Sequence, residues 1–141
     1  ELGLANDVVF TGMVPMSEAH ERVSKAAVCL SPFYPIPILL STSPTKISEY
    51  MALGRPVVAN EHPEQSIIIA ESGGGHCVEW SAEAFAQAII SLLADPAEAE
   101  RMGQKGREYV ARHRTYSVVA PCVAAKYREL LGKSNYSDAL S

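Results

Sequence analysis

The sequence predicts an α/β fold, in which a parallel sheet of about four strands is flanked by helices and followed by a helical C-terminal third. Two observations lead to this prediction. Short apolar runs alternate with helical stretches through the first 80 residues, which is typical of parallel β–α units. Beyond Trp80, apolar side chains recur at helical spacing to about residue 131, and no further strand-like run follows.

The first elements are short. Residues 8–11 are rich in β-forming side chains and predict the first strand. Ser17 is a suitable N-cap for a helix that continues to about Lys25. Residues 27–30 then predict a second, buried strand.

A long loop is expected over residues 31–42, where three prolines separate aromatic and aliphatic side chains. Loops of this length in a compact domain are usually functional or disordered. This loop is too apolar for a solvated linker. We expect it to cover a site or to pack on a partner surface; the alternative is a loop that folds back on its own core.

Residues 43–59 organise the chain, because they predict a loop, a helix, a turn and a buried strand without a break. Pro44 suits the first helical position, where its missing N–H has no cost, and Ser43 is a good N-cap. Gly54 fits the helix exit. The strand over residues 57–59 is expected to be buried on both faces.

The helix in this stretch has two faces. Its apolar face has the spacing of a core stripe and consists of Ile47, Tyr50, Met51 and Gly54. Thr45, Lys46 and Glu49 lie on another side. The helix start therefore offers backbone N–H groups, a positive dipole end and a lysine to an anion, with a carboxylate one turn further in. The alternative is a plain Lys46–Glu49 pair on a solvated face.

The rest of the chain adds one strand and several helices. Residues 66–70 predict a short buried helix, residues 72–75 its end, and residues 76–78 a fourth strand. The later helices are expected to begin at Ser81, Asp95 and Tyr116.

Ligands bind an open α/β sheet at the carboxyl ends of its strands. Residues 12–14, 31–43 and 60–65 follow strands and therefore lie at this edge. Residues 72–75 precede a strand, so their glycines indicate helix termination rather than a phosphate loop. His62 is the one histidine at the ligand edge, and a single loop histidine is more often solvated than a ligand.

Composition excludes several classes of function. The 141 residues carry a formal net charge of −4 without a basic cluster, which disfavours nucleic-acid binding. No apolar run is long enough to span a membrane, and the start shows no signal-peptide pattern. Three separated cysteines, Cys29, Cys77 and Cys122, indicate a reduced cytoplasmic setting and give little support for a metal site.

The stretch from Pro44 to Val58 has the form Pro-Thr-Lys-x-x-Glu-Tyr-Met-Ala-x-Gly-x-Pro-Val-Val. It resembles the nucleotide-binding helix of retaining GT-B glycosyltransferases of family 4, in a branch that builds bacterial surface polysaccharides. Residues 8–12, 102–107 and 116–117 support the resemblance, which covers most of the chain. It implies that residues 1–133 are part of the Rossmann-like C-terminal domain, which binds the donor, and that residues 134–141 are a disordered tail.

The resemblance also implies roles for particular residues. Glu49 matches the glutamate that holds the donor ribose, a task that suits a carboxylate accepting two vicinal hydroxyls. The loop whose backbone amides meet the donor pyrophosphate matches Thr42, Ser43, Thr45 and Lys46. The loop against the base matches Gly12, Met13 and Val14. Ser41 stands where the family often has a second glutamate, so the sequence leaves open how the sugar is held.

The implied substrate is a UDP- or GDP-linked sugar, with no cofactor and no metal. The family's N-terminal acceptor domain and the first two β–α units of its C-terminal domain are not in this sequence. No catalytic residue is therefore assigned here, and the chain alone is expected to be inactive. A peripheral inner-membrane position would depend on the missing domain. The incomplete sheet predicts that strand 8–11 pairs in a non-native way with the next strand, or that a second copy fills the gap.

Two other functions stay open at this point. A GT-B epimerase acting on a nucleotide sugar would use the same fold. A non-enzymatic binding module would carry Lys46 and Glu49 as a surface pair and use residues 33–40 as its partner surface. The sequence does not specify the base, the sugar or the acceptor.

Overall fold

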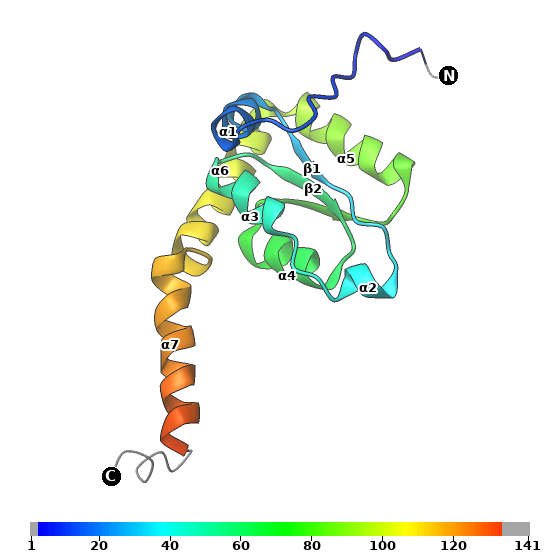
Figure 1. Ribbon diagram of the computed structural model, residues 1–141. Coiled ribbons are helices and arrows are strands. Elements are labelled where there is room, and N and C mark those ends of the chain that lie inside the picture. The colour runs from blue at the N-terminus through cyan, green and yellow to red at the C-terminus, as the bar shows by residue number, and fades with distance from the viewer. Residues whose placement is uncertain (1–2, 134–141) are drawn as a thin grey trace.

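The structure, a computed structural model, describes residues 3–133 (Figure 1). Within this range, one parallel sheet with the order β1-β2-β3 is formed by β1 (Cys29–Ser31), β2 (Val57–Asn60) and β3 (Gly75–Val78). The expected α/β class and parallel sheet are confirmed, with three strands rather than about four. The predicted tail over residues 134–141 lies outside the described residues.

The helices follow in chain order as α1 (Met16–Lys25), α2 (Pro37–Leu40), α3 (Thr45–Ala52), α4 (Pro63–Ser72), α5 (Ala82–Ala94), α6 (Pro96–His113) and α7 (Tyr116–Lys133). The α2 turn lies inside the segment expected to be a plain loop. The expected helix starts at Ser81 and Asp95 are confirmed, because both side chains cap their helices by accepting a hydrogen bond from the third residue beyond each of them.

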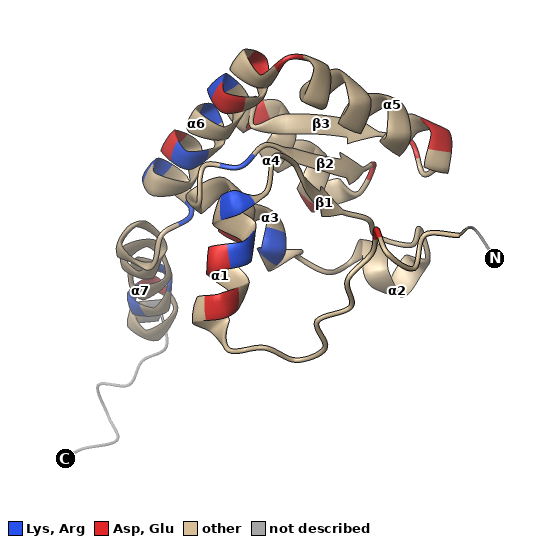
Figure 2. Cartoon of the chain, turned by 90° about the horizontal axis from the view of Figure 1, so that it is seen from above, with Lys and Arg blue, Asp and Glu red and all other residues tan. Residues whose placement is uncertain are grey.

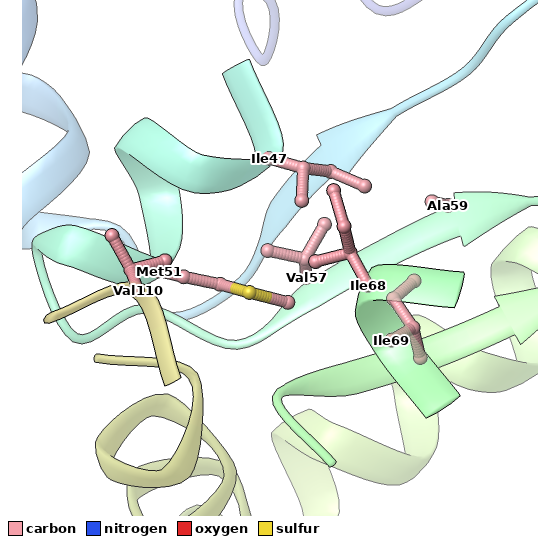
Figure 3. Close-up of a cluster of buried hydrophobic side chains, with 7 residues drawn as sticks. All are labelled: Ile47, Met51, Val57, Ala59, Ile68, Ile69 and Val110. Atoms are coloured by element: carbon pink, nitrogen blue, oxygen red, sulfur yellow. The ribbon is translucent and has the colours of Figure 1, made fainter. Parts of the chain in front are cut away.

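The sheet lies between two groups of helices, and the alternation of side chains along β2 separates two cores. Val57 and Ala59 face α3 and α4, where they pack with Ile47, Met51, Ile68 and Ile69, and Val110 of α6 completes this cluster (Figure 3). Val58 faces the other way and packs with Leu92 of α5 and Ala99 of α6. All four residues of β2 are buried, as expected for a central parallel strand.

Helix α6 packs closely against α3 where two of its residues are glycines. A Cβ on Gly103 would overlap the carbonyl oxygen of Gly54, and a Cβ on Gly106 would lie 2.8 Å from Cγ of Met51. Both glycines are buried. The absence of their side chains therefore permits the close approach of α6 to α3 and to the turn that leads into β2.

The prediction of a strand over residues 8–11 is wrong. The structure has no strand there, and Val9 and Phe10 are 76% and 93% exposed. A strand needs a neighbour for its backbone hydrogen bonds, and β-forming side chains do not supply one. The expected non-native pairing with β1 is not observed either, whereas filling of the gap by a second copy stays a prediction.

Smaller differences concern helix and strand ends. Pro44 is the N-cap of α3, with the extended ψ of 100°, so the helix begins at Thr45 rather than at Pro44. Pro15, not Ser17, precedes α1. The strand expected over residues 27–30 begins two residues later, and α4 is longer than residues 66–70 because Pro63 supplies its first helical residue.

Thiol reactivity is expected to differ sharply between two cysteines. Cys29 is buried in β1, and burial raises the pKa of its thiol to about 11, although the Arg55 charge opposes the shift. Cys122 is exposed on α7. At pH 8 a thiol reagent such as DTNB is therefore expected to modify Cys122 first and Cys29 only on unfolding. Equal rates for Cys29 in native and denatured protein would contradict this.

Candidate functional site

Buried polar side chains gather where β1 and β2 end. Ser31 and Asn60 are the last residues of these strands, and both are 1% exposed or less. The Ser31 hydroxyl donates to Oε1 of Gln65, and Nε2 of Gln65 donates to the Asn60 carbonyl at 3.1 Å. Because buried polar groups are costly unless paired, this network fixes the carboxyl edge of the sheet.

Asn60 also holds the loop that leaves β1. The Phe33 N–H donates to Oδ1 of Asn60 at 2.7 Å, and Nδ2 of Asn60 donates to the Phe33 carbonyl at 2.9 Å. These two bonds fix the backbone of Phe33 against the end of β2. Sequence reasoning did not identify Ser31, Asn60 or Gln65; the available signal was a polar residue ending each of two buried apolar strands.

His62 is a second anchor for the same loop. It is 3% exposed, so the interpretation of a solvated loop histidine is wrong. Its Nε2 lies 2.9 Å from the Leu39 carbonyl in α2, and its ring meets the Phe33 ring edge-on at 5.3 Å between centroids. Since a carbonyl oxygen only accepts, this contact requires a hydrogen on Nε2. The Nδ1 atom is buried without a hydrogen-bond partner.

The Leu39 carbonyl also accepts two hydrogen bonds from Thr42. The Thr42 N–H and hydroxyl donate to it at 3.1 and 2.7 Å. One main-chain oxygen therefore joins His62, the N-cap of α4, to the first residue of the segment expected to meet a diphosphate. Ser41 repeats the arrangement by donating to the Ile38 carbonyl at 2.9 Å.

The N-terminus of α3 lies at this edge because the segment that follows β1 leads into it (Figure 1). Its N-cap, Pro44, has no side-chain acceptor, and no side chain caps the first turn. The first-turn N–H groups and the positive dipole end are thus open to an anion. Thr45 and Glu49 are exposed one turn apart, which places them on one face.

Lys46 lies beside this helix end. The alternative of a plain Lys46–Glu49 surface pair would require its ammonium to contact the Glu49 carboxylate. Its Nζ lies 5.1 Å from the centroid of the Phe33 ring. Among the ion pairs of residues 3–133 there is none between Lys46 and Glu49. The ammonium is therefore held near the loop by an aromatic face, which leaves its N–H donors available.

The structure brings together part of the expected site. Thr42, Ser43, Thr45, Lys46 and Glu49 form one continuous segment at the carboxyl edge. The segment of Gly12, Met13 and Val14 lies apart, in the stretch that enters α1 at the other end of the domain from α2 (Figure 1). Gly12 has open space around it, and Met13 is fully exposed.

The opposite edge of the sheet carries the glycines that end α4 and a surface hollow. Gly73 ends α4 in the left-handed conformation at φ 62°, which confirms helix termination for the triple glycine. A hollow of about 880 Å³ lies at this edge, lined by the turn before β2 and by α5 and α6. It is separate from the N-terminus of α3.

Residues 3–133 carry charges of both signs, with no large patch of one sign on α1 or α6 (Figure 2). Figure 2 shows Lys and Arg interspersed with Asp and Glu on α1 and α6, as in the Glu18–Arg22 and Glu108–Arg112 pairs. No group of three His, Cys, Asp or Glu side chains in this range could hold a metal ion. None of its helices combines the length and apolarity required to cross a bilayer.

Comparison with known proteins finds both a family match and similar solved structures. The family model described as glycosyl transferases group 1 matches residues 1–95. The fold is similar to that of sucrose-phosphate synthase from Thermosynechococcus elongatus, with a TM-score of 0.79 and 29% sequence identity. The match covers 93% of this chain and 32% of that one, so the chain spans about a third of its relative's length. No curated protein matches.

Proposed function

The chain belongs to the glycosyl transferases group 1 family, and we propose that it holds the nucleoside diphosphate of a sugar donor at the N-terminus of α3. The observation that carries this proposal is the uncapped start of α3, with Lys46 on one side and exposed Glu49 one turn in. Members of this family bind nucleotide sugars. A diphosphate matches the free N–H groups, the dipole and the ammonium together.

The proposed role of each residue follows from the chemistry of its donor and acceptor groups. The backbone of residues 42–46 and the Lys46 ammonium meet the diphosphate, and the Glu49 carboxylate accepts two ribose hydroxyls. Charge stabilisation of the departing diphosphate would be the main catalytic contribution, with retention at the transferred sugar. The Pro44–Val58 sequence form supports surface-polysaccharide synthesis as the setting. The acceptor site would lie outside this chain.

Calorimetric titration of the full protein with UDP, GDP and inorganic pyrophosphate tests the proposal directly. Saturable binding of at least one nucleoside diphosphate is expected, with weaker binding of the matching nucleoside. Because the helix N-terminus favours anions, affinity should fall as ionic strength rises. Absence of binding by all three probes would overturn the proposed function.

Replacing Glu49 by alanine is expected to lower affinity for the preferred ribonucleoside diphosphate by about tenfold, because a charged acceptor of two hydroxyls is lost. The unaltered protein should also bind the 2′-deoxy form more weakly, whereas Glu49→Ala should bind both forms alike. Titration of the two nucleotides against both proteins measures this. Glu83→Ala is the control, since it removes an exposed carboxylate from α5. Full discrimination by Glu49→Ala would contradict the ribose role.

A further inference from the structure

His62 is linked to the proposed diphosphate segment indirectly, through Leu39 and through Phe33. Its Nε2 shares the Leu39 carbonyl with the N–H and hydroxyl of Thr42. Its ring meets the edge of Phe33, whose ring in turn lies near the Lys46 ammonium. One buried side chain thus reaches both ends of the stretch from Thr42 to Lys46.

We propose that His62 is a positioning residue that sets the donor-binding segment through the Leu39 carbonyl. This inference rests on the proposed function above. Exposed α2 has no buried residue of its own, so its position depends on contacts made by its neighbours. The hydrogen bond from Nε2 ties α2 to the start of α4, where His62 is the N-cap. Thr42 then takes its position from the same oxygen.

A positioning role for His62 predicts an effect on ligand binding that a general packing role would not. Loss of the Nε2 donor removes the tie between α2 and the start of α4 and leaves the Leu39 carbonyl with local donors only, from Ser41 and Thr42. The segment must then be ordered when the ligand binds. Ordering at that moment lowers affinity. The penalty applies to ligands that contact residues 42–46, and therefore to diphosphates. A nucleoside without phosphates is affected little.

The test compares His62→Met, which removes the donor, with His62→Gln, whose side-chain amide can place an N–H near the position of Nε2. In the full protein, His62→Met is expected to weaken UDP or GDP binding about tenfold, the factor that corresponds to one hydrogen bond. His62→Gln should stay within about threefold of the unaltered protein. Uridine or guanosine affinity should change little in either variant.

His76→Met is the matched control, because His76 is a partly buried histidine on β3, and it should bind as the unaltered protein does. Wild-type diphosphate affinity in His62→Met, or equal losses in His62→Met and His62→Gln, would overturn the inference. Failure of the unaltered protein to bind any probe would instead overturn the proposed function.

A measurement on the unaltered protein keeps the inference testable if a variant fails to fold. The Nε2–H proton of His62 is expected to give a protected NMR signal, since it is buried and bonded. Binding of UDP or GDP at residues 42–46 should shift this signal through the shared carbonyl. Saturating nucleotide without any shift would overturn the positioning role.

Discussion

Replacing Lys46 by methionine is expected to weaken binding of UDP and GDP by about tenfold to a hundredfold, the range for a lost hydrogen bond to a charged group. Methionine keeps much of the apolar stem and removes only the ammonium. The same loss is expected for inorganic pyrophosphate, whereas nucleoside binding should be unchanged. Titration at low and high salt should also show a weaker salt dependence in the variant.

Lys105→Met provides the control for net charge, because Lys105 is exposed on α6 and borders the hollow at the opposite edge of the sheet. Its diphosphate affinity should equal that of the unaltered protein. The thermal midpoint should stay the same in both variants, since neither side chain belongs to a core. Unchanged pyrophosphate affinity in Lys46→Met would exclude Lys46 from the diphosphate site.

Replacing Gly103 by alanine is expected to destabilise the fold by about 3 kcal/mol. The new Cβ would overlap the Gly54 carbonyl oxygen, and a backbone atom cannot avoid the overlap by changing rotamer. The gain in helix propensity, about 1 kcal/mol, is too small to offset this. Urea unfolding followed by circular dichroism measures the change.

Gly132→Ala is the matched control, because Gly132 is also helical and a Cβ there meets nothing within 4 Å. Its stability should equal or slightly exceed that of the unaltered protein. A loss of stability in Gly103→Ala no larger than in Gly132→Ala would show that α6 can shift away from the turn without cost.

Local signals predicted the segment from α3 to β2 well, because a proline, a glycine and an apolar stripe each determine structure within a few residues. The same kind of reasoning failed for residues 8–11. Their side chains favour a strand, but pairing is a tertiary event, and the described chain supplies no neighbour for them.

The candidate site likewise combines features that local sequence signals predict with features that depend on tertiary packing. The sequence predicts the start of α3 with Lys46 in its first turn, but its prediction of Ser43 as the N-cap is wrong, because Pro44 takes that position and leaves α3 without a side-chain cap. The support of the site does not follow from sequence, because the burial of His62 and Asn60 depends on how the loop after β1 folds over the end of β2. A histidine in a loop gives no local signal of the partner that it will meet.

The contact that holds α2 is made by the main-chain oxygen of Leu39, so substitutions of the α2 side chains are expected to leave it in place. Every residue presents a main-chain carbonyl, so the His62 contact does not depend on the chemical nature of the side chain at position 39. Ile38 and Leu40 are exposed. Residues 38–40 can therefore diverge between relatives, or be randomised in a library, while the segment that follows keeps its place.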